Sequence, residues 1–260
     1  MKSTFGPGRS AALAWVLAGC GVAGGAEGLS DGGVLVGEGG TASPAAALAD
    51  EVFEAPGATF DGFGDPSRAT NGVRGGGPNG GSLDVYSLDD AARPYLSLGW
   101  NGRRVMDGPG ADLVVFENAF RLMSGMDQFM DPIVVSVSRD GRVWVDLPHD
   151  YVAPDERLYV RDPDAWQGFA GRTPVLLHTE EHPVDPFDPI AAGGDAFDLA
   201  ALPSDGGEGD AIRLEGARYV RLQSATRRTN PDVGAPFPRD FAGNGADIDG
   251  VFGRWVTARP

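Results

Sequence analysis

The chain has few cysteine and histidine residues, and it has far fewer positive charges than negative ones. Its 260 residues include one cysteine, three histidines, 21 lysine and arginine residues, and 37 aspartate and glutamate residues. The formal net charge of −16 gives no attraction to phosphate backbones, so we expect no nucleic-acid partner. Clustered carboxylates repel one another unless cations lie among them, which favours bound calcium. The alternative is a soluble acidic surface without an ion.

The most recognisable catalytic motifs are also missing. The sequence has no P-loop and no plausible cysteine nucleophile. Paired carboxylates could serve a glycosidase as acid and base, but five tryptophans and five tyrosines provide few aromatic platforms for a sugar cleft. We therefore expect a protein that is not an enzyme, with glycoside hydrolysis as a remote alternative.

No long hydrophobic run is present at the N-terminus, where residues 11–18 (AALAWVLA) are too few to span a bilayer. Lys2 and Arg9 precede them, as in an export signal. The following Leu17-Ala18-Gly19-Cys20 resembles the lipobox of bacterial lipoproteins. The resemblance implies that residues 1–19 are a signal peptide and that Cys20 becomes the acylated first residue, carrying a lipid such as palmitate. The alternative is an ordinary secretory signal with an incidental cysteine.

The residue after the cysteine indicates the cellular location of the mature protein. Gly21 stands after the cysteine in place of the aspartate that often retains lipoproteins at the inner membrane. We expect an exported protein attached to the outer membrane or cell surface through its lipid. Residues 20–49 are rich in Gly, Ala and Ser without sustained periodicity, which predicts a flexible tether. Residues 50–260 then form the folded domain.

Glycine and proline are abundant, and this favours β structure. Forty glycines and twenty prolines without a collagen period indicate many turns between short strands, while 42% hydrophobic residues suffice for a core. Residues 57–81 predict a long loop. Asn101-Gly102 and Asp140-Gly141 are hairpin signals. Strands are predicted at residues 50–53, 85–88, 95–100, 104–106, 113–116, 133–138, 143–145, 157–160, 174–177, 211–214, 218–222 and 248–256.

This pattern predicts an all-β fold, specifically an antiparallel β-sandwich or jelly roll with long loops. One run stands out: residues 108–118 (GPGADLVVFEN) contain a Gly/Pro turn, an acid, four apolar residues, and then a carboxylate beside a carboxamide. The methionines Met123, Met126 and Met130 follow at spacings of three and four, which is typical of core packing.

Several motifs occur in an order that resembles a family of uncharacterised bacterial cell-surface lipoproteins. They are residues 85–88 (VYSL), 107–120 (DGPGADLVVFENAF), 135–141 (VSVSRDG), 170–175 (AGRTPV), 193–199 (GGDAFDL) and 247–251 (DIDGV). The resemblance covers roughly residues 51–257. Residues 135–144 are also similar to a hairpin of the discoidin or galactose-binding-like jelly roll. Such domains bind glycans at loop tips and often hold a structural calcium ion, and the resemblance implies both here.

Oxygen-bearing side chains near strand ends are the candidate metal ligands, since calcium takes six to eight oxygens. Asp247 and Asp249 lie two residues apart and would share one face of a regular strand, which is costly without a cation or a donor. The alternative is that Glu117, Asn118 and Asp195 cap turns by accepting backbone N–H bonds. The candidates are Asp112, Glu117, Asn118, Asp195, Asp198, Asp247 and Asp249.

Two functions are consistent with these features. One is a lipid-anchored binding module that grips a glycan or surface polymer and carries a structural calcium site. The other is a structural or adhesive envelope lipoprotein whose partners are proteins. Aromatic side chains at loop tips would mark the first, and the sequence offers Trp100, Trp166, Tyr151 and Phe237 as candidates.

Overall fold

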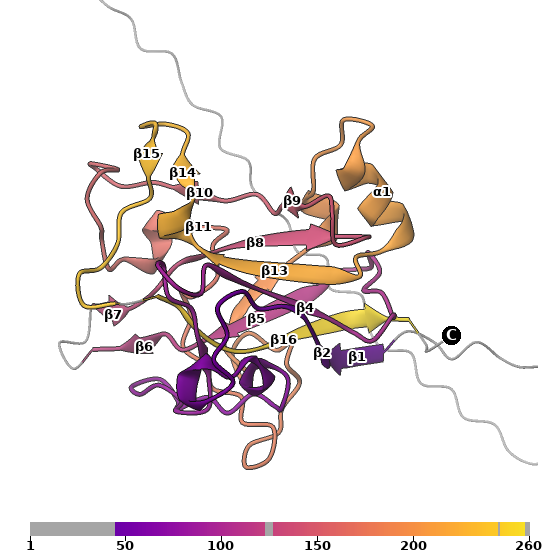
Figure 1. The fold of residues 1–260 in the computed structure, drawn as a ribbon, viewed down its shortest axis with the longest axis horizontal. Coiled ribbons are helices and arrows are strands. Elements are labelled where there is room, and N and C mark those ends of the chain that lie inside the picture. Colours follow the sequence, from indigo (N-terminus) through magenta and orange to yellow (C-terminus); the bar gives the residue numbers. More distant parts are fainter. Residues whose placement is uncertain (1–44, 123–126, 244, 258–260) are drawn as a thin grey trace, which may run out of the picture. The chain divides into compact units, whose positions relative to one another are not determined.

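The computed structural model describes residues 45–122, 127–243 and 245–257 (Figure 1). The predicted signal peptide, Cys20, residues 20–44 of the predicted tether, and two of the methionines, Met123 and Met126, lie outside the described residues. The chain divides into two units, Met1–Gly40 and Thr41–Pro260, and the architecture below is that of the second unit. Within the described residues, no helix has the length and apolar character needed to cross a bilayer.

Two antiparallel five-stranded sheets form an all-β sandwich, as the sequence predicted. In sheet A, β3 also pairs with β16, and the order of the other four strands is β1-β16-β5-β12. Its strands are β1 (Ala45–Leu48), β3 (Tyr86–Ser87), β5 (Leu113–Glu117), β12 (Asp195–Phe197) and β16 (Asp247–Val256). Sheet B has the order β2-β4-β13-β8-β9, with β2 (Glu51–Glu54), β4 (Tyr95–Gly99), β8 (Ile133–Ser138), β9 (Val145–Asp146) and β13 (Tyr219–Ser224).

The main core lies between the two sheets, and the pleat of each strand decides which residues reach it. In β5, Leu113 and Val115 enter this core, whereas Val114 and Phe116 point to the other side of sheet A. β8 behaves alike, because Ile133, Val135 and Val137 enter the main core while Val134 points outward into a second cluster. Both faces of these strands are therefore covered, which explains their nearly continuous apolar sequence.

Long loops provide the outer cover on both sides. Outside sheet A, Val114 and Phe116 pack with Val73, Val175 and Phe187. Outside sheet B, Val134 packs with a cluster of aromatic residues that the connecting segments supply. The loops also contain three two-stranded antiparallel ribbons. They are β6 (Phe120–Arg121) with β7 (Gln128–Phe129), β10 (Asp150–Tyr151) with β11 (Trp166–Gln167), and β14 (Thr229–Asn230) with β15 (Ala235–Pro236).

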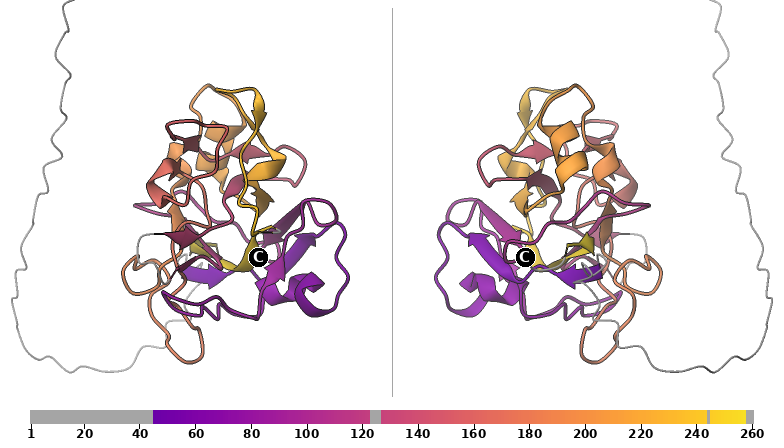
Figure 2. Two further views of the ribbon diagram at one scale, coloured as in Figure 1. Left: turned by 90° about the vertical axis from the view of Figure 1, so that its left-hand side faces the viewer. Right: turned by 90° about the vertical axis from the view of Figure 1, so that its right-hand side faces the viewer.

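The helices are short. The one α-helix in the described part of the chain is α1 (Glu208–Glu215). The 3₁₀ helices are η1 (Gly62–Gly64), η2 (Pro66–Ala69), η3 (Pro163–Ala165), η4 (Leu199–Ala201) and η5 (Ala225–Arg227). Figures 1 and 2 show η1 and η2, in indigo, at the base of the unit and the ribbon β14–β15 at its top. The loops that carry η1 and η2 and those that carry β14 and β15 thus lie on opposite sides of the sandwich.

Four strand predictions are wrong, including that at residues 104–106, where only Val105 makes isolated bridges, with Ala217 and Val256. Residues 211–214 lie in α1, where Ile212 alone faces the core and Gly216, with a φ of 83°, ends the helix. Residues 157–160 form no strand, and in 174–177 only Val175 makes an isolated bridge, with Gly193. The apolar side chains at these positions pack partly or fully against the core clusters without pairing along a strand, and a short apolar group of this kind does not identify a strand.

The domain also begins earlier than the sequence predicted. Residues 45–48, assigned to the tether, form β1 and pair antiparallel with β16, and Ala49 is fully buried. Small alanine side chains gave little hydrophobic signal, but they allow close packing against the last strand. By contrast, the strand predicted at residues 50–53 corresponds to β2, and the one at 248–256 corresponds to β16.

One of the two predicted hairpins is present. β8 pairs with β9 across the Asp140-Gly141 turn, with Ser136 opposite Asp146. Asn101 and Gly102 do turn the chain with positive φ values of 49° and 79°. The following Val105 then bridges to Ala217 and Val256 instead of returning along β4. A turn signal fixes the local backbone but not the partner of the next segment.

Trp100 provides a test of how β1 is attached. Its indole is fully buried, and Nε1 donates to the backbone oxygen of Ala47 at 3.1 Å. Trp100→Phe keeps an aromatic ring but leaves that carbonyl without its donor, so we expect a loss of about 1–3 kcal/mol in the free energy of unfolding, measured by urea denaturation. Trp144→Phe is the matched control, since the Trp144 indole is only half-buried and bonds within its own turn. Equal effects of the two substitutions would contradict this assignment.

Candidate functional site

The acidic residues predicted as ligands gather at both ends of β5 instead of at one edge. Asp112 precedes the strand and Glu117 ends it. The antiparallel neighbours bring further acids to each end: Phe197 pairs with Leu113, which places Asp198 near the start, and Ile248 pairs with Glu117, which places Asp247 near the finish. Acids distant in sequence do become neighbours at each end of β5, as predicted. The seven predicted ligands do not, however, come together at one place.

At the start of β5, the carboxylate oxygens of Asp107, Asp112 and Asp198 lie within 4.8 Å of one another. Asp112 is fully buried and accepts backbone N–H bonds from Gly108 at 3.0 Å and Leu199 at 2.8 Å. Burial raises its pKa to about 7. Asp198 caps η4 by accepting from Ala200 N at 2.8 Å. We call these three residues the Asp112 group.

The Asp112 group has the composition of a cation site, but two of its three members already have structural roles. Both oxygens of Asp112 hold backbone donors, and one oxygen of Asp198 does so. Asp107 was not predicted from the sequence. Its only signal is its place in the Gly/Pro turn before the strand, which gives no hint that the turn folds back toward Asp198.

At the finish of β5, Glu117 is 2% exposed, and its Oε1 accepts from Asp247 N at 3.2 Å. Asp247 in turn accepts from the Ser87 hydroxyl. The Asn118 carboxamide is committed to the backbone of Ser82, donating from Nδ2 to its oxygen at 3.0 Å and accepting from its N–H. Asn118 therefore closes a loop, as the turn-capping alternative suggested.

Asp131 joins Glu117 and Asp247 at this end, although the sequence did not predict it. Burial raises the pKa of Asp131 to about 7, and the carboxylates of Asp247, Asp240 and Asp90 add to the shift. Burial is also the main reason that the pKa of Glu117 is raised, followed by repulsion from Asp131 and Asp247. We call Glu117, Asp131 and Asp247 the Glu117 group.

Asp195 is a fully partnered carboxylate. It is 4% exposed, and it accepts from Arg172 N at 2.8 Å, from Thr173 N at 3.3 Å and from the Thr173 hydroxyl at 2.8 Å. The Arg172 guanidinium lies 3.7 Å away. These donors fix the segment that follows Gly171, so the arrangement explains Asp195 as a structural residue.

Asp249 does not share its surroundings with Asp247, because the strand is irregular between them. The pairing of β16 with β5 shifts between Ile248 and Gly250, which is the signature of a β-bulge. Both oxygens of Asp249 accept from Arg74 N, at 2.9 and 3.0 Å. Burial raises the pKa of Asp249 to about 7. The regular alternation assumed in the sequence argument does not apply to this pair.

The four aromatic residues suggested as glycan contacts are part of the interior. Trp100 and Trp166 are fully buried, Tyr151 is 1% exposed and Phe237 is 3% exposed. Trp166, Tyr151 and Phe237 pack together in the cluster outside sheet B, with the rings of Tyr151 and Trp166 4.0 Å apart. Large rings in otherwise polar loops serve here to bury those loops against the sheet.

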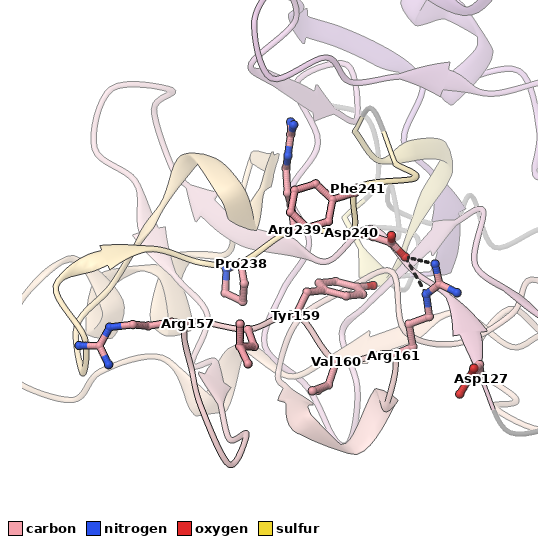
Figure 3. A pocket seen from close by; sticks show the side chains of 10 residues that line it. Asp127, Arg157, Tyr159, Val160, Arg161, Pro238, Arg239, Asp240 and Phe241 are labelled. Atoms are coloured by element: carbon pink, nitrogen blue, oxygen red, sulfur yellow. Dashed lines mark hydrogen bonds and ion pairs between the residues drawn. The ribbon is translucent and has the colours of Figure 1, made fainter.

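A groove of about 660 Å³ lies beside this aromatic cluster, lined by residues 157–161 and 238–241 and by Asp127. In the view of Figure 3, the ring of Tyr159 lies between Pro238 and the ion pair of Arg161 with Asp240. The Tyr159 hydroxyl donates to the backbone oxygen of Met130 at 2.6 Å, so only part of the ring faces the groove. The volume is in the range of small-molecule sites.

The side chains at the rim of the groove are exposed. Phe241 is 95% exposed, and Arg157 and Arg239 form no ion pair with any residue in the described part of the chain. Figure 3 shows the two guanidinium groups extending away from the ring of Tyr159. The groove thus combines aromatic surface with two arginines that form no ion pair among the described residues, in a strongly acidic protein. The sequence pattern predicts a strand at residues 157–160 and therefore gives no sign of a groove wall there.

Comparison with known proteins assigns no family. No protein-family model matches the chain, and no curated protein matches it.

The role of Asp195 can be tested directly. An Asn at this position keeps only one acceptor oxygen, so part of the Arg172–Thr173 segment loses its partner, and we expect Asp195→Asn to lower the free energy of unfolding by about 1–3 kcal/mol. The measurement is urea denaturation in the presence of EDTA. Asp162→Asn is the control, because Asp162 caps η3 at the surface and Asn caps equally well. A loss no larger than that of the control would argue against the structural role.

The buried carboxyl groups predict a pH dependence with a definite sign. Asp112, Asp131 and Asp249 have pKa values of about 7 in the folded chain, above the ordinary value near 4. The folded state therefore binds protons more readily than the unfolded state, and stability decreases as pH rises from about 5 to about 8. Urea midpoints measured in excess EDTA across this range test the sign. Urea midpoints that rise with pH would contradict the raised pKa values, because they would show that hydrogen-bond donors or positive charges stabilise the ionised carboxylates in the folded chain.

Proposed function

We propose that the protein is an exported, lipid-anchored binding module that holds an acidic glycan or surface polymer in the groove beside Tyr159. The observation that carries the proposal is the composition of the rim, where the exposed Phe241 ring lies beside Arg239 and Arg157 lies at the opposite end of the groove (Figure 3). A sugar ring can lie on an aromatic face, and guanidinium groups donate to hydroxyl and carboxylate oxygens. We also propose the galactose-binding-like jelly roll as the finer fold, which the similarity of residues 135–144 to its hairpin supports, with a calcium ion as a structural element.

The groove favours binding over cleavage. Glycosidases use two carboxyl groups on either side of the scissile bond. Of the two acids that line the groove, Asp240 is 8% exposed and is held by Arg161 through contacts of 2.7 and 2.8 Å. Only Asp127 is left as a second acid among the described lining residues. This supports a module that retains its ligand unchanged.

Glycan binding by the full chain tests the proposal, with Cys20→Ser as a common background to prevent acylation. We expect saturable binding to polymers that contain uronic acids and weaker binding to neutral ones. Phe241→Ala and Arg239→Gln should each reduce affinity roughly tenfold, which corresponds to about 1.4 kcal/mol. Both side chains are exposed, so neither change should affect folding.

The chain offers matched controls for both substitutions. Leu214 is 79% exposed on α1, and Arg142 is exposed in the β8–β9 turn, so neither lines the groove. Leu214→Ala and Arg142→Gln should leave affinity unchanged. Absence of saturable binding to every polymer, together with retention of an envelope protein in pull-down experiments, would instead favour the adhesive function.

A further inference from the structure

The Glu117 carboxyl group has one oxygen without a partner. Glu117 is 2% exposed, and Oε2 has no hydrogen-bond partner among the described residues. Buried polar atoms are almost always partnered, so an unpartnered carboxylate oxygen requires an explanation such as an ion or a water. The same end of the sheet has a second such atom, Oδ1 of Asp90.

The charges that act most strongly on this oxygen are negative. Repulsion from Asp131, Asp247 and Asp195 adds to the effect of burial on Glu117. Asp131 is in turn repelled by Asp247, Asp240 and Asp90. Of the nearby arginines, Arg172 pairs with Asp195 and Arg161 pairs with Asp240, whereas Arg93 lies close enough to Asp247 to lower its pKa. The Glu117 group therefore concentrates several negative charges inside the fold, and Arg93 offsets part of the charge of Asp247.

Two glycines keep the space around these carboxylates open. A Cβ on Gly171 would lie 3.2 Å from Glu117 Oε2 and 2.7 Å from the backbone oxygen of Asp131. A Cβ on Gly243 would lie 2.3 Å from Asp131 Oδ1. Gly171 also has a φ of 83°, which disfavours any side chain. The Asp131 carbonyl oxygen, which faces the same space, is a further possible oxygen ligand.

We propose that a calcium ion binds between Glu117 Oε2 and the carboxylates of Asp131 and Asp247. These oxygens would move closer together around the ion, because among the described residues only the Asp112 group already has three ligand oxygens within 4.8 Å of one another. All the available donors are oxygens, three of them from carboxylates, and this donor set suits a hard cation. Calcium is favoured over magnesium, because magnesium retains several waters and requires near-octahedral geometry, whereas this site is buried and irregular. The ion would satisfy the unpartnered oxygen and remove the mutual repulsion of the group.

The position of this ion connects it to the groove. Met130, the neighbour of Asp131, accepts the hydrogen bond from the Tyr159 hydroxyl, and Asp240 lies close enough to Asp131 to raise its pKa. Asp240 also holds Arg161 in the groove wall. The ion would therefore fix the inner wall of the groove. This last step rests on the proposed function, whereas the ion site itself does not.

The test measures calcium alone, by isothermal titration calorimetry of the full chain in the Cys20→Ser background. Glu117→Gln and Asp131→Asn should abolish binding or weaken it at least tenfold. Asp107→Asn, which removes one carboxylate of the Asp112 group, should leave it unchanged. The Asp112 group is the competing location, so calcium that is lost in Asp107→Asn and kept in Glu117→Gln would overturn the assignment and leave a structural ion elsewhere.

Thermal melting separates an ion site from a merely structural role of Glu117. Glu117→Gln removes a buried charge but nearly preserves shape, so in EDTA its midpoint should equal or exceed that of the parent chain. Saturating calcium should raise the midpoint of the parent by about 5 °C or more and leave that of Glu117→Gln unchanged. A parent chain that neither binds calcium nor responds to EDTA would overturn the inference. Glycan binding, measured separately, would still decide the proposed function.

Discussion

Both faces of the central strands are buried, one by the main core and the other by loops, and the rest of the structure depends on this burial. β5 alternates its side chains between the main core and the cluster outside sheet A, so every residue of the strand is buried. The residues at its ends, Asp112 and Glu117, inherit that burial although they carry carboxyl groups. Burial of an ionised group is costly unless partners are supplied, so the fold must supply them.

The fold meets this requirement in different ways at different positions. Asp112, Asp195 and Asp249 receive backbone N–H donors from segments distant in sequence, and these bonds fix loops against sheet A. Glu117 receives one such donor, through Oε1, and keeps one unpartnered oxygen. Carboxylates of similar appearance in the sequence therefore divide into acceptors of backbone bonds and one carboxyl group, that of Glu117, with an unpartnered oxygen. The loops that cover sheet B produce the groove, and a chain of contacts through Met130 and Tyr159 joins the two features.

Much of the fold could be predicted from local patterns. The apolar runs at residues 113–116 and 133–135 identified buried strands, and Asp140-Gly141 identified the β8–β9 hairpin. Prediction failed where a short apolar group served a loop, as at residues 157–160, or where the residues were small, as in β1. Prediction of the site reached Glu117 and Asp247 but missed Asp131, because nothing in its neighbourhood distinguishes it from an acid in an ordinary turn.

The sequence by itself determined the class of fold, the acidity of the molecule and the presence of carboxylates at strand ends, because these depend on residue types and their short-range spacing. Tertiary structure alone decided which carboxylates meet, since register and the bulge in β16 set Asp247 beside Glu117 and direct Asp249 to Arg74. It also decided that the large aromatic residues lie inside and that Phe241 and two arginines form the rim of the groove. Pairing and burial are properties of contacts between distant segments, and local sequence does not encode them.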